Sequence, residues 1–178
     1  MEQEPDFAET RRAGAAVLDA FGRLNAAKQE AEAAFAALPR FLRGVAESAM
    51  GAEIARQTGQ DLSAWAVTIG GLTRQIEAAR ARLDRAENGE TLGPDERDRL
   101  RRLAGELDTE GARLGRLLRF MEEGPAKIER LARQLLNAGR RQMALDNLRV
   151  QTQALRDALE AMPALARGLR RSADAERP

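Results

Sequence analysis

The sequence contains no cysteine and no histidine. Without cysteine the chain forms no disulfide and has no thiolate nucleophile. Without histidine it has no imidazole base or metal ligand, which excludes a histidine phosphorelay and the Glu-x-x-His di-metal sites of helical bundles. Phosphate-binding glycine loops and nucleophile elbows are absent as well. We therefore predict a protein with no catalytic residues, no metal site and no cofactor.

Aromatic residues are scarce, at 3% of the chain, with five Phe, one Trp and no Tyr. The hydrophobic fraction is 43%, but much of it is alanine. A core of leucine and alanine favours narrow seams between long helices over a thick globular interior. No segment shows the alternating pattern of a β-strand. The composition therefore predicts an all-α fold: an elongated antiparallel bundle of about five helices with coiled-coil-like seams.

The chain also lacks a charge excess, because 29 basic and 28 acidic residues leave a formal net charge of +1. Proteins that depend on phosphate contacts usually carry a basic excess, so the overall charge does not favour nucleic acid as a partner. Lys28 and Lys127 are the only lysines, and the other basic residues are arginine. The codon usage of a GC-rich genome explains this bias more simply than an anion-binding role.

No long hydrophobic run is present. The longest weakly polar stretch, Leu62–Leu72, has eleven residues, whereas a membrane-spanning helix needs about 20. Residues 1–6 are acidic and have neither the basic nor the apolar region of a signal peptide. We expect a cytoplasmic protein that meets a membrane only at its surface.

The most regular pattern lies between Asp61 and Glu123, where apolar residues recur at alternating steps of three and four. The first segment contains Leu62, Trp65, Ile69, Leu72, Ile76, Ala79, Leu83 and Ala86. The second contains Leu100, Leu103, Leu107, Leu114, Leu117 and Met121, with Glu110 among them. Residues 88–94 between the segments hold the Gly and Pro that end one helix and begin the next. This pattern predicts an antiparallel helical hairpin with an apolar seam.

We predict a single helical domain over residues 1–178. Its helices are expected at about residues 5–38, 39–58, 61–88, 94–123 and 125–162, followed by a short amphipathic tail at 163–172 and a disordered end from Ser172. Prolines mark most of these boundaries, because a proline inside a helix removes a hydrogen bond and clashes with the preceding turn. Residues 58–61 have the composition of a helix stop followed by an aspartate N-cap. Pro39 leaves two alternatives, a reversal of the chain or a kink, since the apolar heptad continues beyond it.

Three polar residues occupy seam positions: Lys28, Glu110 and Gln142. A polar residue in a seam fixes register and oligomeric state at some cost in stability. If the first and fourth helices are antiparallel, Lys28 and Glu110 are placed to pair inside the bundle. The alternative is that each side chain extends from a loose seam to solvent.

Local charge is less even than the total. Residues 111–141 contain eight basic and three acidic residues. The candidate interaction face consists of Arg113, Arg116, Arg119, Lys127, Arg130 and Arg133. Two interpretations remain open: a solvated face balanced by acidic segments elsewhere, or a surface for an acidic protein, an anionic lipid or a nucleic acid. Nucleic acid is the least favoured, because Phe120 is the only aromatic residue available for stacking there.

Gly70 and Gly71 interrupt the third predicted helix, where each costs about 1 kcal/mol relative to alanine. A kink or a helix that passes close by explains them most simply. The functional alternative is a site where the backbone of a partner approaches.

These patterns favour a non-catalytic helical interaction protein: a scaffold, an adaptor or an oligomerising coiled coil that presents helical surfaces to a protein partner. We expect a homo-oligomer, because narrow seams leave apolar stripes that one chain does not cover. The alternative is a peripheral protein that lies on anionic membrane through a basic helical face together with either the apolar stripe of residues 41–50 or the C-terminal tail. A nucleic-acid accessory factor is the more distant alternative.

Overall fold

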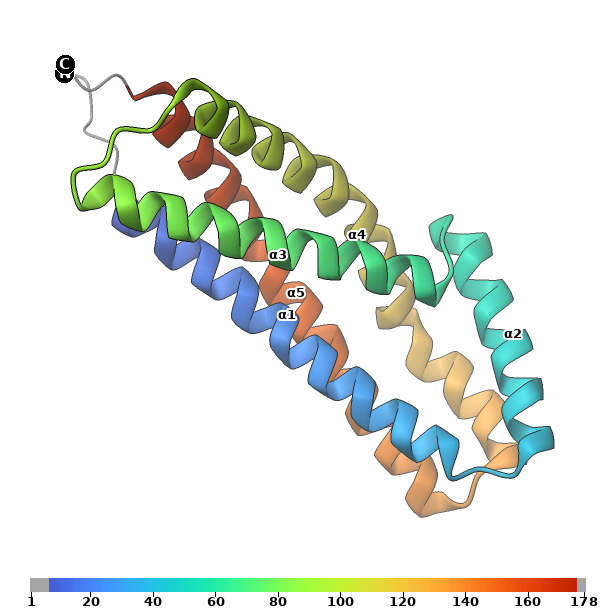
Figure 1. Cartoon of the computed structure of the whole chain (residues 1–178). Coiled ribbons are helices and arrows are strands. Elements are labelled where there is room, and N and C mark those ends of the chain that lie inside the picture. Colours follow the sequence, from blue (N-terminus) through green and yellow to red (C-terminus); the bar gives the residue numbers. More distant parts are fainter. Residues whose placement is uncertain (1–6, 176–178) are drawn as a thin grey trace.

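The computed structural model describes residues 7–175, except for the side chains of residues 41, 42, 45–50, 127, 128, 131, 132, 134 and 135. The described chain forms five α-helices and contains no strand (Figure 1). The helices are α1 (Phe7–Ala36), α2 (Arg40–Thr58), α3 (Leu62–Glu87), α4 (Pro94–Leu135) and α5 (Ala138–Asp174). The prediction of an all-α helical bundle is confirmed.

Helices α1, α3, α4 and α5 form an antiparallel bundle in which α5 lies beside α1 and α4, and α3 lies beside the same two helices (Figure 1). Contacts across α1 and α5 show their opposite directions: Arg171 pairs with Glu9, whereas Asn147 donates a hydrogen bond to the carbonyl oxygen of Ala27. Since α4 is also antiparallel to α5, α1 and α4 run in the same direction at opposite corners. The chain therefore alternates direction around the bundle, as its short connections require.

The core of the bundle is made mainly of leucine and alanine, as the composition predicts. The apolar seam of α3 is buried from Trp65 onward except for the half-buried Ile69, and the leucine seam of α4 is buried from Leu100 to Met121. Leu62, the first residue of the predicted α3 seam, is instead 48% exposed. Burying each of these leucines contributes about 1.5–3 kcal/mol, and α1 and α5 supply most of the remaining buried apolar residues.

The closest helix packing involves α5 with α1 and α4, because small residues face each other there. At Gly168 a Cβ atom would lie 2.3 Å from the hydroxyl oxygen of Thr10 and 3.0 Å from its Cβ. At Gly124 a Cβ atom would lie 3.2 Å from Leu148. The predicted hairpin of α3 and α4 is present, but its larger seam side chains hold these two backbones farther apart. The tightest seam is therefore not the one that the heptads emphasise.

The helices divide into two regions with different packing. The packed half comprises residues 7–27, 65–87, 94–121 and 154–174, where all four bundle helices meet. The split half comprises residues 28–58 and 124–150, where α2 accompanies the end of α4 and makes little contact with α1 or α5 (Figure 1). In the split half the seam residues Phe35 of α1 and Leu145 of α5 are only partly buried, and so is Leu38 in the turn between α1 and α2.

The corner between α2 and α3 agrees with its local sequence. Gly59 ends α2 with φ of 80°, in the left-handed region that glycine adopts without strain. The Asp61 carboxylate accepts a hydrogen bond of 2.8 Å from the backbone N–H of Ala64, as an N-cap does. Trp65 is buried and donates its indole N–H to the Thr58 hydroxyl at 3.1 Å. This side-chain bond fastens the end of α2 to the start of α3.

Two predicted helix boundaries are wrong. We expected α4 to end at Gly124, but it runs through Pro125 to Leu135, and the turn falls at residues 136–137. Pro163 likewise lies inside α5 instead of ending it. An interior proline costs about 3 kcal/mol in an isolated helix. Here tertiary packing offsets that cost. Met121, four residues before Pro125, and Met162, directly before Pro163, are both buried.

The predicted tail at 163–172 is also corrected, since it forms the most deeply buried part of α5. The buried residues there are Leu165, Ala166, Gly168, Leu169, Ser172 and Ala173. Ser172 and Ala173 are therefore ordered in the helix and not part of a disordered end; residues 176–178 lie outside the described chain. The Pro39 alternatives resolve to a reversal, because α1 ends at Ala36 and α2 turns back beside α4 (Figure 1). The predicted helix start at Pro5 lies outside the described residues.

Candidate functional site

The predicted pairing of Lys28 with Glu110 is wrong. The two residues belong to α1 and α4, which occupy opposite corners and run in the same direction. Lys28 instead pairs with Glu32 at 3.0 Å on its own helix. A contact between Lys28 and Glu110 required α1 and α4 to be antiparallel neighbours, but these helices lie diagonally across the bundle.

Glu110 and Gln142 also differ from each other. Glu110 keeps a seam position: its side chain is 18% exposed, Arg113 donates to one carboxylate oxygen at 2.9 Å, and the other oxygen is buried without a hydrogen-bond partner among the described atoms. Gln142 is exposed and donates to Asp146 on the same helix at 2.8 Å, so it does not lie in a seam. It lies in the split half, where α2 makes little contact with α5.

The candidate basic face is only partly free. Arg113 and Arg133 form ion pairs within α4, with Glu110 at 2.9 Å and Glu129 at 3.0 Å. Arg116, Arg119 and Arg130 are exposed and form no ion pair in the described part of the chain. The side chain of Lys127 lies outside the described residues. Three of the six predicted residues therefore remain available as exposed cations.

Ion pairs between helices neutralise much of the remaining surface charge. Three of them span the groove between α4 and α5: Arg101 with Asp174 at 2.9 Å, Arg170 with Asp108, and Arg156 with Glu122 at 2.7 Å. Two span α1 and α5: Arg23 with Asp157 at 2.9 Å and Arg171 with Glu9 at 3.1 Å. Arg11 joins α1 to α3 through Asp84 and Glu87.

These pairs change acid strengths in the expected direction. The pKa of Asp157 lies below its ordinary value because Gln153, and then Arg23, donates a hydrogen bond to its carboxylate. The pKa of Arg156 is raised by its hydrogen bond to Glu122. All these side chains are solvent-accessible, so the pairs orient helices more than they stabilise them.

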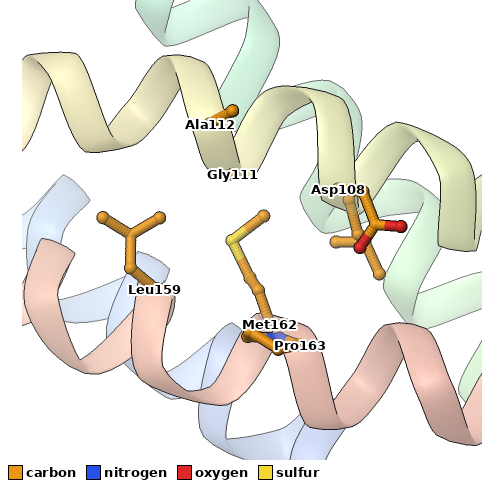
Figure 2. A pocket seen from close by; sticks show the side chains of 7 residues that line it. Asp108, Gly111, Ala112, Leu159, Met162 and Pro163 are labelled. Atoms are coloured by element: carbon orange, nitrogen blue, oxygen red, sulfur yellow. The ribbon is translucent and has the colours of Figure 1, made fainter.

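A hollow of about 240 Å³ opens in the groove between α4 and α5 (Figure 2). Leu107, Leu159 and Met162 supply apolar walls, and Gly111 and Ala112 leave room where larger residues would fill it. Figure 2 shows the Met162 side chain extending from α5 toward Gly111. A Cβ atom at Gly111 would lie 3.5 Å from the Met162 methyl carbon.

The rest of the lining comes from Asp108 and Pro163. Pro163 has no backbone N–H, so the carbonyl of Leu159 loses its helical partner beside the hollow. Asp108 is exposed at the opposite end and is already paired with Arg170. The sequence places Gly111 and Ala112 far from Pro163. It carried no signal that would bring them together, because the register between α4 and α5 is set by tertiary packing.

Gly70 and Gly71 do not lie beneath another helix. Among the described atoms, nothing comes within 4 Å of a Cβ placed at Gly71, and the nearest atom to one at Gly70 is Arg74 of the same helix at 3.8 Å. Helix α3 is continuous through both residues. Close packing within this chain therefore does not account for them, and contact with a partner stays a prediction.

The described residues hold no group of three or more acidic side chains arranged to bind a metal ion. Within the same residues, none of the helices combines the length and the low polarity needed to cross a bilayer. Comparison with known proteins adds no relatives: no family model, no curated protein and no solved structure matches this chain.

Proposed function

We propose that this protein is a non-catalytic helical interaction protein, a scaffold or adaptor that binds a protein partner or a second copy of itself through helix–helix contacts. The observation that carries the proposal is the incomplete burial of the seam in the split half. Phe35 and Leu145 continue the apolar pattern of α1 and α5 but remain partly buried, as does Leu38 in the turn after α1. Met143, on the same part of α5, is 64% exposed.

A helix supplied from outside the chain would complete this seam. Apolar side chains at helical spacing bind a partner helix by removing apolar surface from water, which contributes about 25 cal/mol of free energy per Å² buried. The packed half shows what completion looks like, since most seam residues there are buried, as Leu107 and Leu155 are. The proposal includes a cytoplasmic location and self-association as its simplest form.

The test measures molar mass by light scattering over a range of concentrations, together with photo-crosslinking from a reactive residue placed at Leu38. We expect self-association or a crosslinked partner, and we expect the variant Phe35→Ser, Leu145→Ser to weaken either by at least about tenfold. Val67→Ser is the matched control, because Val67 is 73% exposed and lies on α3, away from this seam. A strictly monomeric chain with no crosslink above that of a probe at Thr109 would contradict the proposal.

A second candidate, peripheral binding to anionic membrane, has one specific observation in its favour. Arg116, Arg119 and Arg130 form an exposed row along α4 with no ion pair among the described residues. The apolar stripe of residues 41–50 that we expected beside it lies outside the described side chains. Flotation with anionic vesicles at two salt concentrations tests this function, since electrostatic binding weakens as salt increases. Binding to neutral vesicles that is insensitive to salt would count against it.

A further inference from the structure

The hollow between α4 and α5 combines an apolar interior with a charged rim. Its floor is Met162, which is 2% exposed, and its walls include Leu107 and Leu159. Ala112 and Pro163 at its mouth are exposed, so the hollow opens to solvent. At about 240 Å³, it is smaller than the roughly 300–1,000 Å³ of sites that hold a whole small molecule. The size fits one inserted apolar side chain.

Free positive charge lies on the same faces. Arg116 and Arg119 follow Ala112 by four and seven residues, and Arg167 follows Pro163 by four, so helical spacing places them beside the hollow. All three are exposed and form no ion pair in the described chain. The carboxylates on that rim are Glu160, three residues before Pro163, and Asp108, which is already paired with Arg170. The excess of cations over carboxylates selects a partner of negative charge.

Resting on the proposed function, we propose that this groove binds an acidic amphipathic helix of a partner protein, which inserts one leucine- or methionine-sized side chain into the hollow. The inserted side chain is the anchor, and it packs against Met162 where Gly111 and Ala112 leave space. Carboxylates on the flanks of the partner helix pair with Arg119 and Arg167. Direct packing holds α4 against α5, and three ion pairs that cross the groove orient the two helices, so the site is formed before binding.

The test uses the full chain with ¹³C-labelled methionine methyl groups. The probe is a synthetic helical peptide of alanine and glutamate with one central leucine. The Met162 resonance is identified by its loss in Met162→Leu. We expect saturable movement of this resonance with the acidic leucine peptide, and at least about tenfold weaker binding by an otherwise identical peptide with alanine at the centre. A lysine version with the same leucine should not bind.

Two pairs of variants separate the anchor from the rim. Ala112→Phe fills the hollow from its exposed mouth and should abolish the Met162 shift, whereas Ala126→Phe, fourteen residues along the same face of α4, should leave it unchanged. Arg119→Glu with Arg167→Glu should reduce affinity at least about tenfold and remove its salt dependence. Arg74→Glu on α3 is the matched charge control, because Arg74 is exposed and far from the hollow.

Several outcomes would overturn the inference. They are an unmoved Met162 resonance at saturating acidic peptide, equal binding of the lysine peptide, or full binding by Ala112→Phe. Anionic vesicles that compete through Arg119 and Arg167 while no peptide reaches Met162 would assign the rim to lipid and also reject it. Failure at the hollow with intact self-association through Phe35 and Leu145 rejects this inference alone. Failure at both sites rejects the proposed function.

Discussion

The two ends of α5 lie in different environments although one helix connects them. Residues 165–173 pack between α1 and α4, and Leu165, Leu169 and Ala173 are at most 1% exposed. Residues 143–150 lie in the split half, and there Met143 and Val150 are 64% and 52% exposed. Each region contains two leucines, and the first also contains Gly168 and two alanines. The number of neighbouring helices and the size of their side chains therefore decide burial more strongly than the apolar content of the segment.

The largest difference between the halves should appear when a leucine is truncated. Leu107 in the packed half is 1% exposed, so Leu107→Ala should cost about 2–5 kcal/mol of unfolding free energy through lost burial and a cavity. Leu145 in the split half is only partly buried, and Leu145→Ala should cost clearly less. Denaturant unfolding followed by circular dichroism measures both. Equal losses would show that the split half is as well packed in solution as the packed half.

The junction between the halves depends on the bond from Trp65 to Thr58. Thr58→Val keeps the shape of the side chain but leaves the buried indole N–H without its acceptor, which should cost about 1–3 kcal/mol. Thr58→Ser retains the hydroxyl and serves as the control. Thermal unfolding compares the two, and hydrogen exchange should show faster exchange in α2 for the valine variant. An unchanged melting temperature would mean that α2 is held by other contacts.

Close packing in the packed half can be tested with alanine at glycine positions. Gly168→Ala places a methyl group against Thr10, with a clash cost of about 1–3 kcal/mol. The gain in helix propensity, up to about 1 kcal/mol, offsets part of this, so the net effect is destabilising. Gly22→Ala has open space around it and should stabilise α1 by about 1 kcal/mol. Stabilisation by both substitutions would show that α1 and α5 separate readily.

The smallest expected effect concerns acid. The folded-state pKa of Asp157 is lowered from 3.8, so its interactions stabilise the fold above that pH and are lost as the pH falls through the lowered value. An NMR titration of the Asp157 carboxyl measures the shift. Gln153→Ala should move the pKa up toward 3.8 more than Arg23→Gln does, because the Gln153 hydrogen bond is the larger cause. No movement in either variant would show that these exposed contacts do not persist in solution.

Much of the fold follows from local sequence signals. The helix stop at Gly59, the N-cap at Asp61 and the loop between α3 and α4 depend on backbone and side-chain contacts within a few residues, and the structure has them where the sequence predicts them. Most of the heptads of α3 and α4 are buried for the same reason, since helical periodicity alone places those residues on one face.

The candidate surfaces were less predictable. The sequence identified the arginines of α4, but not that Arg113 and Arg133 are paired while Arg116 and Arg119 are not. The hollow forms because Gly111 of α4 and Pro163 of α5 lie next to each other in the folded chain. Lys28 and Glu110 failed to pair because the direction of α1 relative to α4 is a property of the whole bundle. No local pattern carries that information.

By itself, then, the sequence determined the helical class, the periodicity of the seams and the caps at the α2–α3 corner, because these depend on neighbours along the chain. Only the tertiary structure decided that Pro125 and Pro163 remain inside helices, since the stabilisation that offsets their cost comes from residues distant in sequence. It also decided that residues 163–172, which we predicted as a tail, form the tightest part of the core. Gly168 packs closely against Thr10 of α1 there because glycine has no side chain.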